Sequence, residues 1–164
     1  MLLTGVFGAG KSAVAAEVAD ILEARGDRYA AIDLDWLTWA DTGSTETGAE
    51  HRMLLTNLAS VVGNYLEVGI RRFVMARSIR DGSELGSLRA AIPVPVRVVR
   101  LTAPMSEIEH RLRSDVTRGR EDDLREAGAW VAQGLGVGIE DLAVANDRPI
   151  RDVAAEIVRW LGWV

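Results

Sequence analysis

The chain has 164 residues, a length that suits one domain with a buried core. Hydrophobic residues make up 48% and charged residues 26%, and the net charge is −5, as in a soluble globular protein rather than a disordered one. The acidic balance disfavours general nucleic-acid binding. The chain has no cysteine, which excludes disulfides, thiolate zinc sites and a cysteine nucleophile.

The beginning of the sequence, residues 1–5, has no basic leader and no long apolar core. We therefore expect neither a secretion signal nor a membrane span, and a cytoplasmic location. We also expect one domain over residues 1–164.

Short apolar runs alternate along the chain with segments of helical period, a pattern typical of a parallel α/β sheet. The predicted strands are residues 1–4, 29–33, 71–77, 94–101 and 141–145. Apolar stripes predict helices after the first and second strands, at Val14, Val18 and Leu22, and at Leu54, Leu58, Val61 and Tyr65. Later helices are predicted at 86–91, 104–113, 121–133 and from Pro149 onward.

The step from the first strand to the first helix carries a G-x-x-x-x-G-K-S pattern, the Walker A motif of phosphate-binding loops. In such a loop the backbone N–H groups point at phosphate oxygens, the lysine reaches the β and γ phosphates, and the serine hydroxyl ligates Mg²⁺. Lys11 is the only lysine, against 18 arginines. A merely structural glycine-rich turn is the alternative. The predicted nucleotide-binding residues here are Gly5, Val6, Phe7, Gly8, Ala9, Gly10, Lys11, Ser12 and Ala13.

The second predicted strand ends in an acid, Asp33, and a second acid, Asp35, lies two residues on. In a parallel sheet both lie at the carboxyl edge, beside the phosphate loop. We assign Asp33, with Ser12, to Mg²⁺ and Asp35 to aligning or deprotonating the acceptor, although the two roles could be reversed. The alternative is that the acids only start a turn or cap a short helix. Because the third strand ends without a carboxylate, a kinase is favoured over an ATPase motor.

These motifs, with the strand-to-helix step at residues 98–104 and the arginines after it, resemble the P-loop small-molecule kinases, the group of shikimate, gluconate, adenylylsulfate and nucleoside monophosphate kinases. The resemblance covers nearly the whole chain. It implies a three-layer α/β/α P-loop NTPase fold, with a five-stranded parallel sheet in the order 2-3-1-4-5 and a small lid. The chain lacks the triple-glycine shikimate signature and the adenylate kinase Asp-Gly-x-Pro-Arg segment, so no named substrate follows.

The resemblance places the lid at residues 111–121, where four arginines occur. Of these we favour Arg113 and Arg118 as catalytic, because guanidinium groups neutralise charge that develops on a transferred phosphoryl group. A solvated helix face with salt bridges is the alternative. The resemblance also lets Asn146 and Arg148 flank the nucleotide base, unless this segment only caps the last helix.

The acceptor side is predicted at residues 36–50 and after the third strand. Trp36 and Trp39 could form a wall of the site or serve as packing anchors. Arg77 and Arg80 would suit an anionic acceptor, and ion pairing with Asp81 or Glu84 would explain them equally well. Trp36, Arg77 and Asp35 are the predicted substrate-binding residues.

The predicted function is Mg²⁺-dependent transfer of the γ-phosphoryl group of ATP to a small molecule or nucleotide. The competing prediction is a regulatory switch that binds ATP and turns it over slowly. A GTPase version is disfavoured, since a guanine-reading Asn-Lys-x-Asp motif would need a second lysine.

Overall fold

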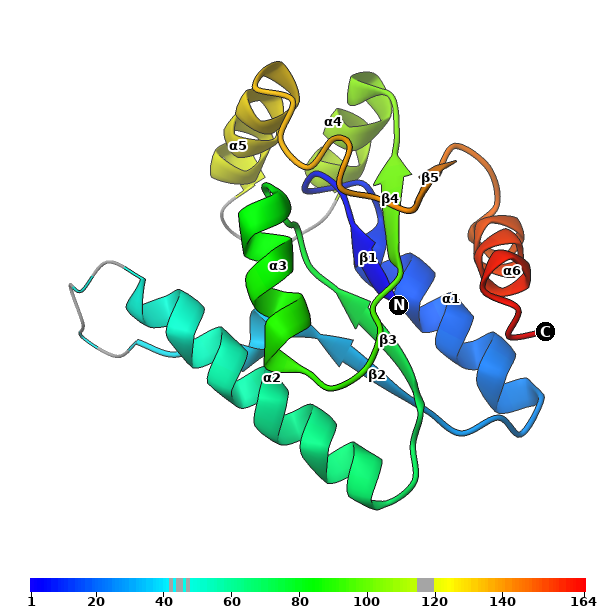
Figure 1. Ribbon diagram of the computed structural model, residues 1–164. Coiled ribbons are helices and arrows are strands. Elements are labelled where there is room, and N and C mark those ends of the chain that lie inside the picture. The colour runs from blue at the N-terminus through cyan, green and yellow to red at the C-terminus, as the bar shows by residue number, and fades with distance from the viewer. Residues whose placement is uncertain (42, 44–45, 47, 115–119) are drawn as a thin grey trace.

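The computed structural model (Figure 1) describes residues 1–41, 43, 46, 48–114 and 120–164, without the side chains of residues 114, 120 and 121. Within this part of the chain one sheet contains five strands in the order β2-β3-β1-β4-β5, and all neighbouring strands are parallel. The order predicted from the family resemblance is therefore confirmed. The strands are β1 (Leu2–Thr4), β2 (Tyr29–Asp33), β3 (Arg72–Ala76), β4 (Val98–Thr102) and β5 (Leu142–Ala145).

Helices cover both faces of the sheet, as Figure 1 shows. One face packs against α1 (Lys11–Ala24) and α6 (Ile150–Leu161), and the other against α2 (Ala49–Glu67) and α3 (Gly82–Ala91). The helices α4 (Met105–Ser114) and α5 (Arg120–Ala132) lie side by side near the phosphate loop, and a short 3-10 helix, η1 (Leu34–Leu37), follows β2. No helix in the described part of the chain is long and apolar enough to cross a membrane.

The core consists of two layers that share the sheet. Leu2 contributes to the layer under α2 and α3, whereas Leu3 contributes to the layer under α1 and α6, because successive side chains of a strand point to opposite faces. Both leucines are fully buried. Burial on both faces explains why the strands read as continuous apolar runs in the sequence.

Two predicted boundaries are wrong for local reasons. β4 begins at Val98, not at residue 94, since Pro95 has no N–H to donate to a central strand. α3 begins at Gly82 instead of residue 86, because the Asp81 carboxylate caps it by accepting from the backbone N–H groups of Ser83 and Glu84 at 2.9 Å.

The apolar stripe of α2 differs from the predicted one at its carboxyl end. Leu54, Leu58 and Val62 are the buried residues of this helix, and they lie four apart. The side chain of Tyr65 is 37% exposed and meets the ring of Phe73 edge-on, with 6.5 Å between ring centroids.

Candidate active site

The phosphate loop joins β1 to α1 at the carboxyl edge of the sheet, where its glycines adopt conformations that other residues avoid. Gly5 has a φ of 135° and Gly10 a φ of 94°. A Cβ atom on Gly10 would lie 2.4 Å from Asn146 Nδ2, and one on Gly5 would lie 2.5 Å from the carbonyl oxygen of Leu101. A side chain on Gly5 would therefore collide with the backbone of β4, and one on Gly10 would force the Asn146 side chain to shift.

Lys11 is the buried cation of the loop, with 9% of the residue exposed. Its ammonium donates hydrogen bonds to the carbonyl oxygens of Gly5 and Val6, both at 3.1 Å, and lies 5.3 Å from the centroid of the Phe7 ring. Burial lowers the pKa of Lys11 to about 8, although the carboxylates of Asp35 and Asp33 oppose the shift. A phosphate group bound to this ammonium would stabilise its charged form.

Ser12 and Asp33 meet across the start of α1 and the end of β2. The Ser12 hydroxyl donates to Asp33 Oδ2 at 3.0 Å, and Asp33 Oδ1 accepts from the backbone N–H of Asp35 at 3.1 Å. Asp33 therefore also caps η1, which is the alternative to metal binding, and it keeps its contact with Ser12 at the same time. A hydroxyl and a carboxylate at hydrogen-bond distance are hard oxygen donors that fit Mg²⁺, which binds few protein ligands and keeps several waters.

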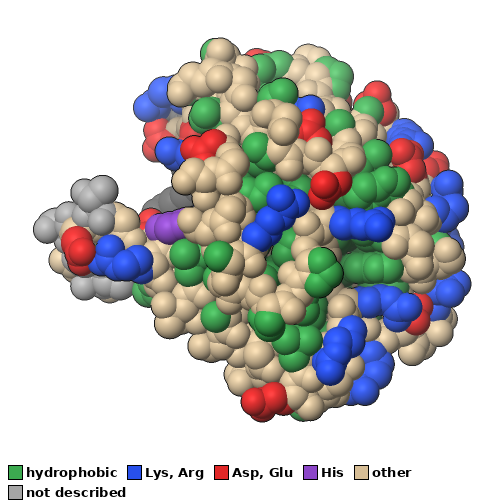
Figure 2. Space-filling model, viewed as in Figure 1, with side chains coloured by type: hydrophobic (Ala, Val, Ile, Leu, Met, Phe, Trp, Pro, Cys, Tyr) green, Lys and Arg blue, Asp and Glu red, His purple; other side chains and the backbone are tan. Residues whose placement is uncertain are grey.

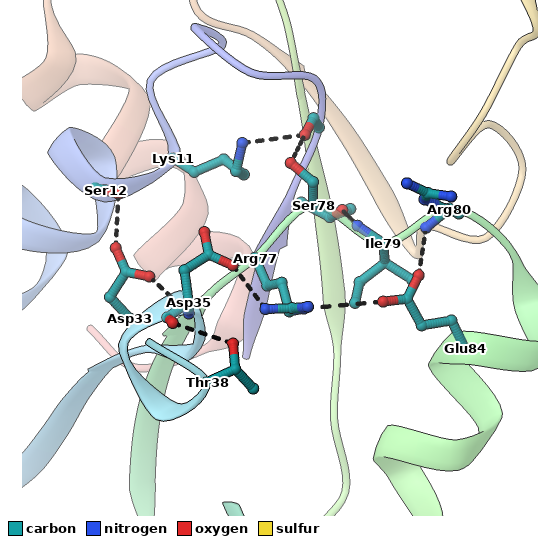
Figure 3. A network of polar contacts seen from close by, with 12 residues as sticks. Lys11, Ser12, Asp33, Asp35, Thr38, Arg77, Ser78, Ile79, Arg80 and Glu84 are labelled. Atoms are coloured by element: carbon teal, nitrogen blue, oxygen red, sulfur yellow. Dashed lines mark hydrogen bonds and ion pairs between the residues drawn. The ribbon is translucent and has the colours of Figure 1, made fainter. Parts of the chain in front are cut away.

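Asp35 lies one residue beyond the start of η1, and its side chain is 58% exposed. Its carboxylate accepts a hydrogen bond from Arg77 Nη1 at 2.7 Å (Figure 3). Desolvation raises the pKa of Asp35, Arg77 and Lys11 lower it, and Asp33 raises it further, leaving a net upward shift. A carboxylate with a raised pKa is a better proton acceptor than an ordinary surface aspartate.

The segment after β3 is attached to the base of the phosphate loop. The Ser78 hydroxyl donates to the Gly5 carbonyl at 2.8 Å, and the backbone N–H of Ile79 donates to the buried Thr4 hydroxyl at 3.0 Å. These contacts leave no signal in the sequence, because they depend on the pairing of β1 with β3. They fix the position of Arg77 relative to the loop.

Two cavities meet at this edge of the sheet. The first, which we call the loop pocket, has a volume of about 300 Å³, and its lining residues are Phe7, Gly8, Gly10, Lys11, Ser12, Ala13, Asp35, Arg111 and Leu112. The second, which we call the side cleft, has a volume of about 450 Å³, and its lining residues are Phe7, Asp35, Thr38, Trp39, Glu50, Arg77, Ser78, Arg80, Glu84, Glu126 and Trp130. Phe7 and Asp35 line both.

Among the lid arginines, the structure brings Arg111 to the loop pocket. Its guanidinium donates to the carbonyl of Asn146 at 2.7 Å and to that of Ala9 at 3.4 Å, and its Nε donates to Glu107 at 3.1 Å. Arg111 shares its face of α4 with Ile108, one turn earlier, which packs in the core. Arg113 and Arg118 are the lid arginines favoured from the sequence instead; the spacing of three residues from the apolar Ile108 is the sequence feature that separates Arg111 from Arg113.

Arg113 lies elsewhere on α4. Its side chain is 72% exposed and stands 3.6 Å from Glu109, one turn back on the same helix. It does not line the loop pocket. Arg118, the other favoured lid arginine, falls outside the described residues.

The residues predicted to flank the base occupy different positions. Asn146 is 1% exposed, and its Nδ2 donates to the carbonyl of Ala9 at 2.8 Å. This buried hydrogen bond stabilises the backbone of the phosphate loop. Arg148 extends toward solvent and pairs with Glu156. Neither residue lines the loop pocket.

The two tryptophans on the acceptor side stack on each other, with ring centroids 4.6 Å apart and ring planes at 32°. Trp39 lines the side cleft and is 76% exposed, whereas Trp36 is 66% exposed and does not line it. Arg77 lies 3.8 Å from Glu84 and forms the ion pair that is the alternative to anion binding.

A further cavity, of about 350 Å³, lies at the opposite edge of the sheet, between the starts of the strands and the end of the chain. Its lining includes Phe73, Arg71, Arg97 and Trp163. Figure 2 shows hydrophobic side chains in a hollow of this face, with Lys and Arg side chains around them. This cavity is separate from the two that meet at the phosphate loop.

No protein-family model matches the chain, and no curated protein is similar enough in sequence to count as a relative. Solved structures do match. A sugar kinase from a Janibacter species has a TM-score of 0.72 and 20% identity, over 98% of this chain and 92% of that one. The adenylylsulfate (APS) kinase of Mycobacterium tuberculosis, solved with AMPPNP and APS, has a TM-score of 0.67 and 21% identity, over 98% and 95%.

A shikimate kinase from Acinetobacter baumannii, solved with shikimate, has a TM-score of 0.59 and 19% identity, over 99% of this chain and 92% of that one. All three are P-loop kinases that act on small molecules. The chain therefore has the fold of the P-loop small-molecule kinases, from the first strand to the last helix.

Proposed function

We propose that the protein is a Mg²⁺-dependent kinase that transfers the γ-phosphoryl group of ATP to a hydroxyl group of a small molecule. One observation carries the proposal: Asp35 lines both the loop pocket and the side cleft. A carboxylate at the boundary of a phosphate site and a second cleft can orient an acceptor hydroxyl toward the terminal phosphate and take its proton.

The loop pocket is proposed to hold the triphosphate. The backbone N–H groups of the phosphate loop, the positive end of α1 and the Lys11 ammonium would bind phosphate oxygens. Ser12 and Asp33 would hold Mg²⁺, which neutralises charge on the phosphates when bound. Arg111 is the arginine of the described residues best placed to contact the phosphates, since it lines the same pocket as Lys11.

Four predicted roles are not part of this arrangement and stay predictions. They are the catalytic roles of Arg113 and Arg118, the place of Arg148 near the nucleotide base and that of Trp36 at the acceptor. The same holds for the cytoplasm as the compartment in which the protein acts. For Asn146 we propose a supporting role, through its hydrogen bond to Ala9.

The experiment that tests the proposal measures ADP formation with ATP and Mg²⁺ in the presence of a broad panel of hydroxyl compounds, and identifies products by mass spectrometry. A kinase gives one phosphorylated product class and turnover that depends on the acceptor. The competing switch function predicts tight ATP binding with slow hydrolysis that no small acceptor increases. Acceptor-independent turnover across the panel would therefore contradict the kinase proposal.

A further inference from the structure

The charges of the side cleft indicate which kind of acceptor it can take. Acidic side chains outnumber basic ones among the described residues that line it. The four acids and two bases are Asp35, Glu50, Glu84, Glu126, Arg77 and Arg80. The formal charge of this lining is therefore −2.

Both arginines of the cleft are already paired with carboxylates. Arg77 donates to Asp35 at 2.7 Å and stands 3.8 Å from Glu84, and 84% of its side chain is buried. Arg80 stands 4.0 Å from Glu126. A guanidinium holds a carboxylate, sulfate or phosphate most strongly through two parallel N–H bonds; here Arg77 already donates to Asp35, and Arg80 stands within ion-pair distance of Glu126. An anionic acceptor would have to displace these carboxylates.

The uncharged part of the wall consists of aromatic rings and of the Thr38 and Ser78 hydroxyls, which already donate to the carbonyls of Asp35 and Gly5. Phe7 and Trp130 meet edge to face, with centroids 6.5 Å apart and planes at 88°, and the exposed Trp39 lies on the acceptor side of the same cleft. Aromatic faces pack against the apolar face of a hydroxylated ring and attract cations, while ionised carboxylates can only accept hydrogen bonds. The walls thus suit a ligand that offers O–H or N–H donors and carries no negative charge.

We propose, on the basis of the function proposed above, that the acceptor is a hydroxylated compound that is uncharged or carries an amine, and that acidic acceptors are excluded. This departs from the anionic acceptor that Arg77 and Arg80 suggest in the sequence. It also differs in charge from shikimate and APS, the acids present in two of the similar solved structures.

The test compares acceptors that share a hydroxyl skeleton and differ in charge: glucose, glucosamine and gluconate as one set, and a nucleoside with its monophosphate as another. Acceptor-dependent ADP formation gives kcat/KM, and quenching of tryptophan fluorescence gives binding independently of turnover. We expect the neutral and amine members of an active set to exceed the acidic member by about tenfold or more in kcat/KM, the effect of a net charge at close range.

A variant pair tests whether the cleft acids cause the preference. Glu126→Gln should raise KM for an amine acceptor several-fold and leave KM for its neutral counterpart within twofold. Asp122→Asn is the matched control, because Asp122 lies on the same helix, pairs with Arg125 and does not line the cleft. The control should change neither value.

The outcomes separate the two proposals. Higher kcat/KM for the acidic members, or no effect of Glu126→Gln on charge preference, overturns the acceptor inference and leaves the kinase function standing. If ATP binds but no member of these sets and no compound of the broad hydroxyl panel binds or alters turnover, the kinase function itself is overturned. Preference for neutral or amine members that weakens in Glu126→Gln supports both.

Discussion

The carboxylate of Asp35 and the guanidinium of Arg77 form a hydrogen-bonded ion pair of 2.7 Å, although 42 residues separate them in the chain. Asp33 at the end of β2 pairs in register with Ala76 at the end of β3. Asp35 and Arg77, which follow these two residues in the chain, therefore lie side by side. The pair connects the proposed acceptor base to a segment that Ser78 fixes to the phosphate loop. Arg77 therefore connects the protonation of Asp35 to the position of the phosphate loop.

Replacing Arg77 by Gln should shift the acidic limb of the pH–rate profile to higher pH. Desolvation raises the pKa of Asp35, and Arg77 is the largest influence that lowers it. A general base is active when it is deprotonated. Loss of Arg77 raises the pKa of Asp35, so a higher pH is needed before the enzyme becomes active. The profile of kcat/KM against pH between 4 and 8 measures the shift. Arg80→Gln serves as control, because Arg80 pairs with Glu126, and an equal shift there would contradict the assignment.

Replacing Asp35 by Asn should lower kcat about 100-fold or more, the range for loss of a general base, while the Kd for ATP changes little. The side chain keeps its size but can no longer accept the acceptor proton. Steady-state kinetics and calorimetric ATP titration provide the two values. Weakened ATP binding with nearly normal kcat would move Asp35 to the nucleotide or metal.

Replacing Lys11 by Met should abolish ATP binding without destabilising the nucleotide-free fold. Lys11 is almost fully buried, and its pKa falls from 10.5 to about 8 on folding. The unfolded chain thus binds the proton more tightly, which costs the wild type on the order of 3 kcal/mol at pH 7, offset in part by its two carbonyl hydrogen bonds. That cost declines as pH rises from 8 toward 10.5, so wild-type stability gains in this window.

Thermal unfolding at pH 7 and pH 9 tests this sign. The melting temperature of Lys11→Met should equal or exceed that of the wild type at pH 7, and its relative advantage should shrink at pH 9. A variant several degrees less stable at pH 7 would show that the ammonium supports the fold.

Replacing Ser12 by Ala should raise the Mg²⁺ concentration needed for half-maximal turnover several-fold, because one of the two proposed oxygen ligands is lost. Asp33→Asn should do the same and also weaken the cap of η1, in which the backbone N–H of Asp35 donates to this carboxylate. Mg²⁺ titrations at saturating ATP give the comparison. An unchanged Mg²⁺ requirement in both variants would exclude this pair as the metal site.

Replacing Arg111 by Gln should reduce kcat/KM for ATP by about tenfold to a thousandfold, as expected for loss of a cation beside transferring phosphate. Arg113→Gln is the matched control on the same helix, since that side chain is exposed and pairs with Glu109. It should lose clearly less activity than Arg111→Gln. The reverse order of effects would return Arg113 to the catalytic role that the sequence suggests.

The sequence alone predicts the phosphate loop, because its chemistry is local. Glycines at fixed spacing, one lysine and one serine between a strand and a helix specify the loop without reference to distant residues. The apolar runs likewise predict the parallel strands, since burial on both faces requires it. The order of the strands was predicted from the family resemblance. The start of β4 depends on Pro95, which has no N–H to donate within a central strand.

The partners of the charged residues were decided only by the tertiary structure. Arg111 and Arg113 stand two positions apart and so face different sides of α4, and only the packing of α4 shows which side meets the phosphate loop. The sequence equally allows Arg77 to bind an anion or to pair with acids. The register of β2 with β3 brings the Arg77 guanidinium within 2.7 Å of the Asp35 carboxylate. At that distance the Coulomb attraction between the two charges is strong, and it depends on the fold because the residues lie far apart in the chain.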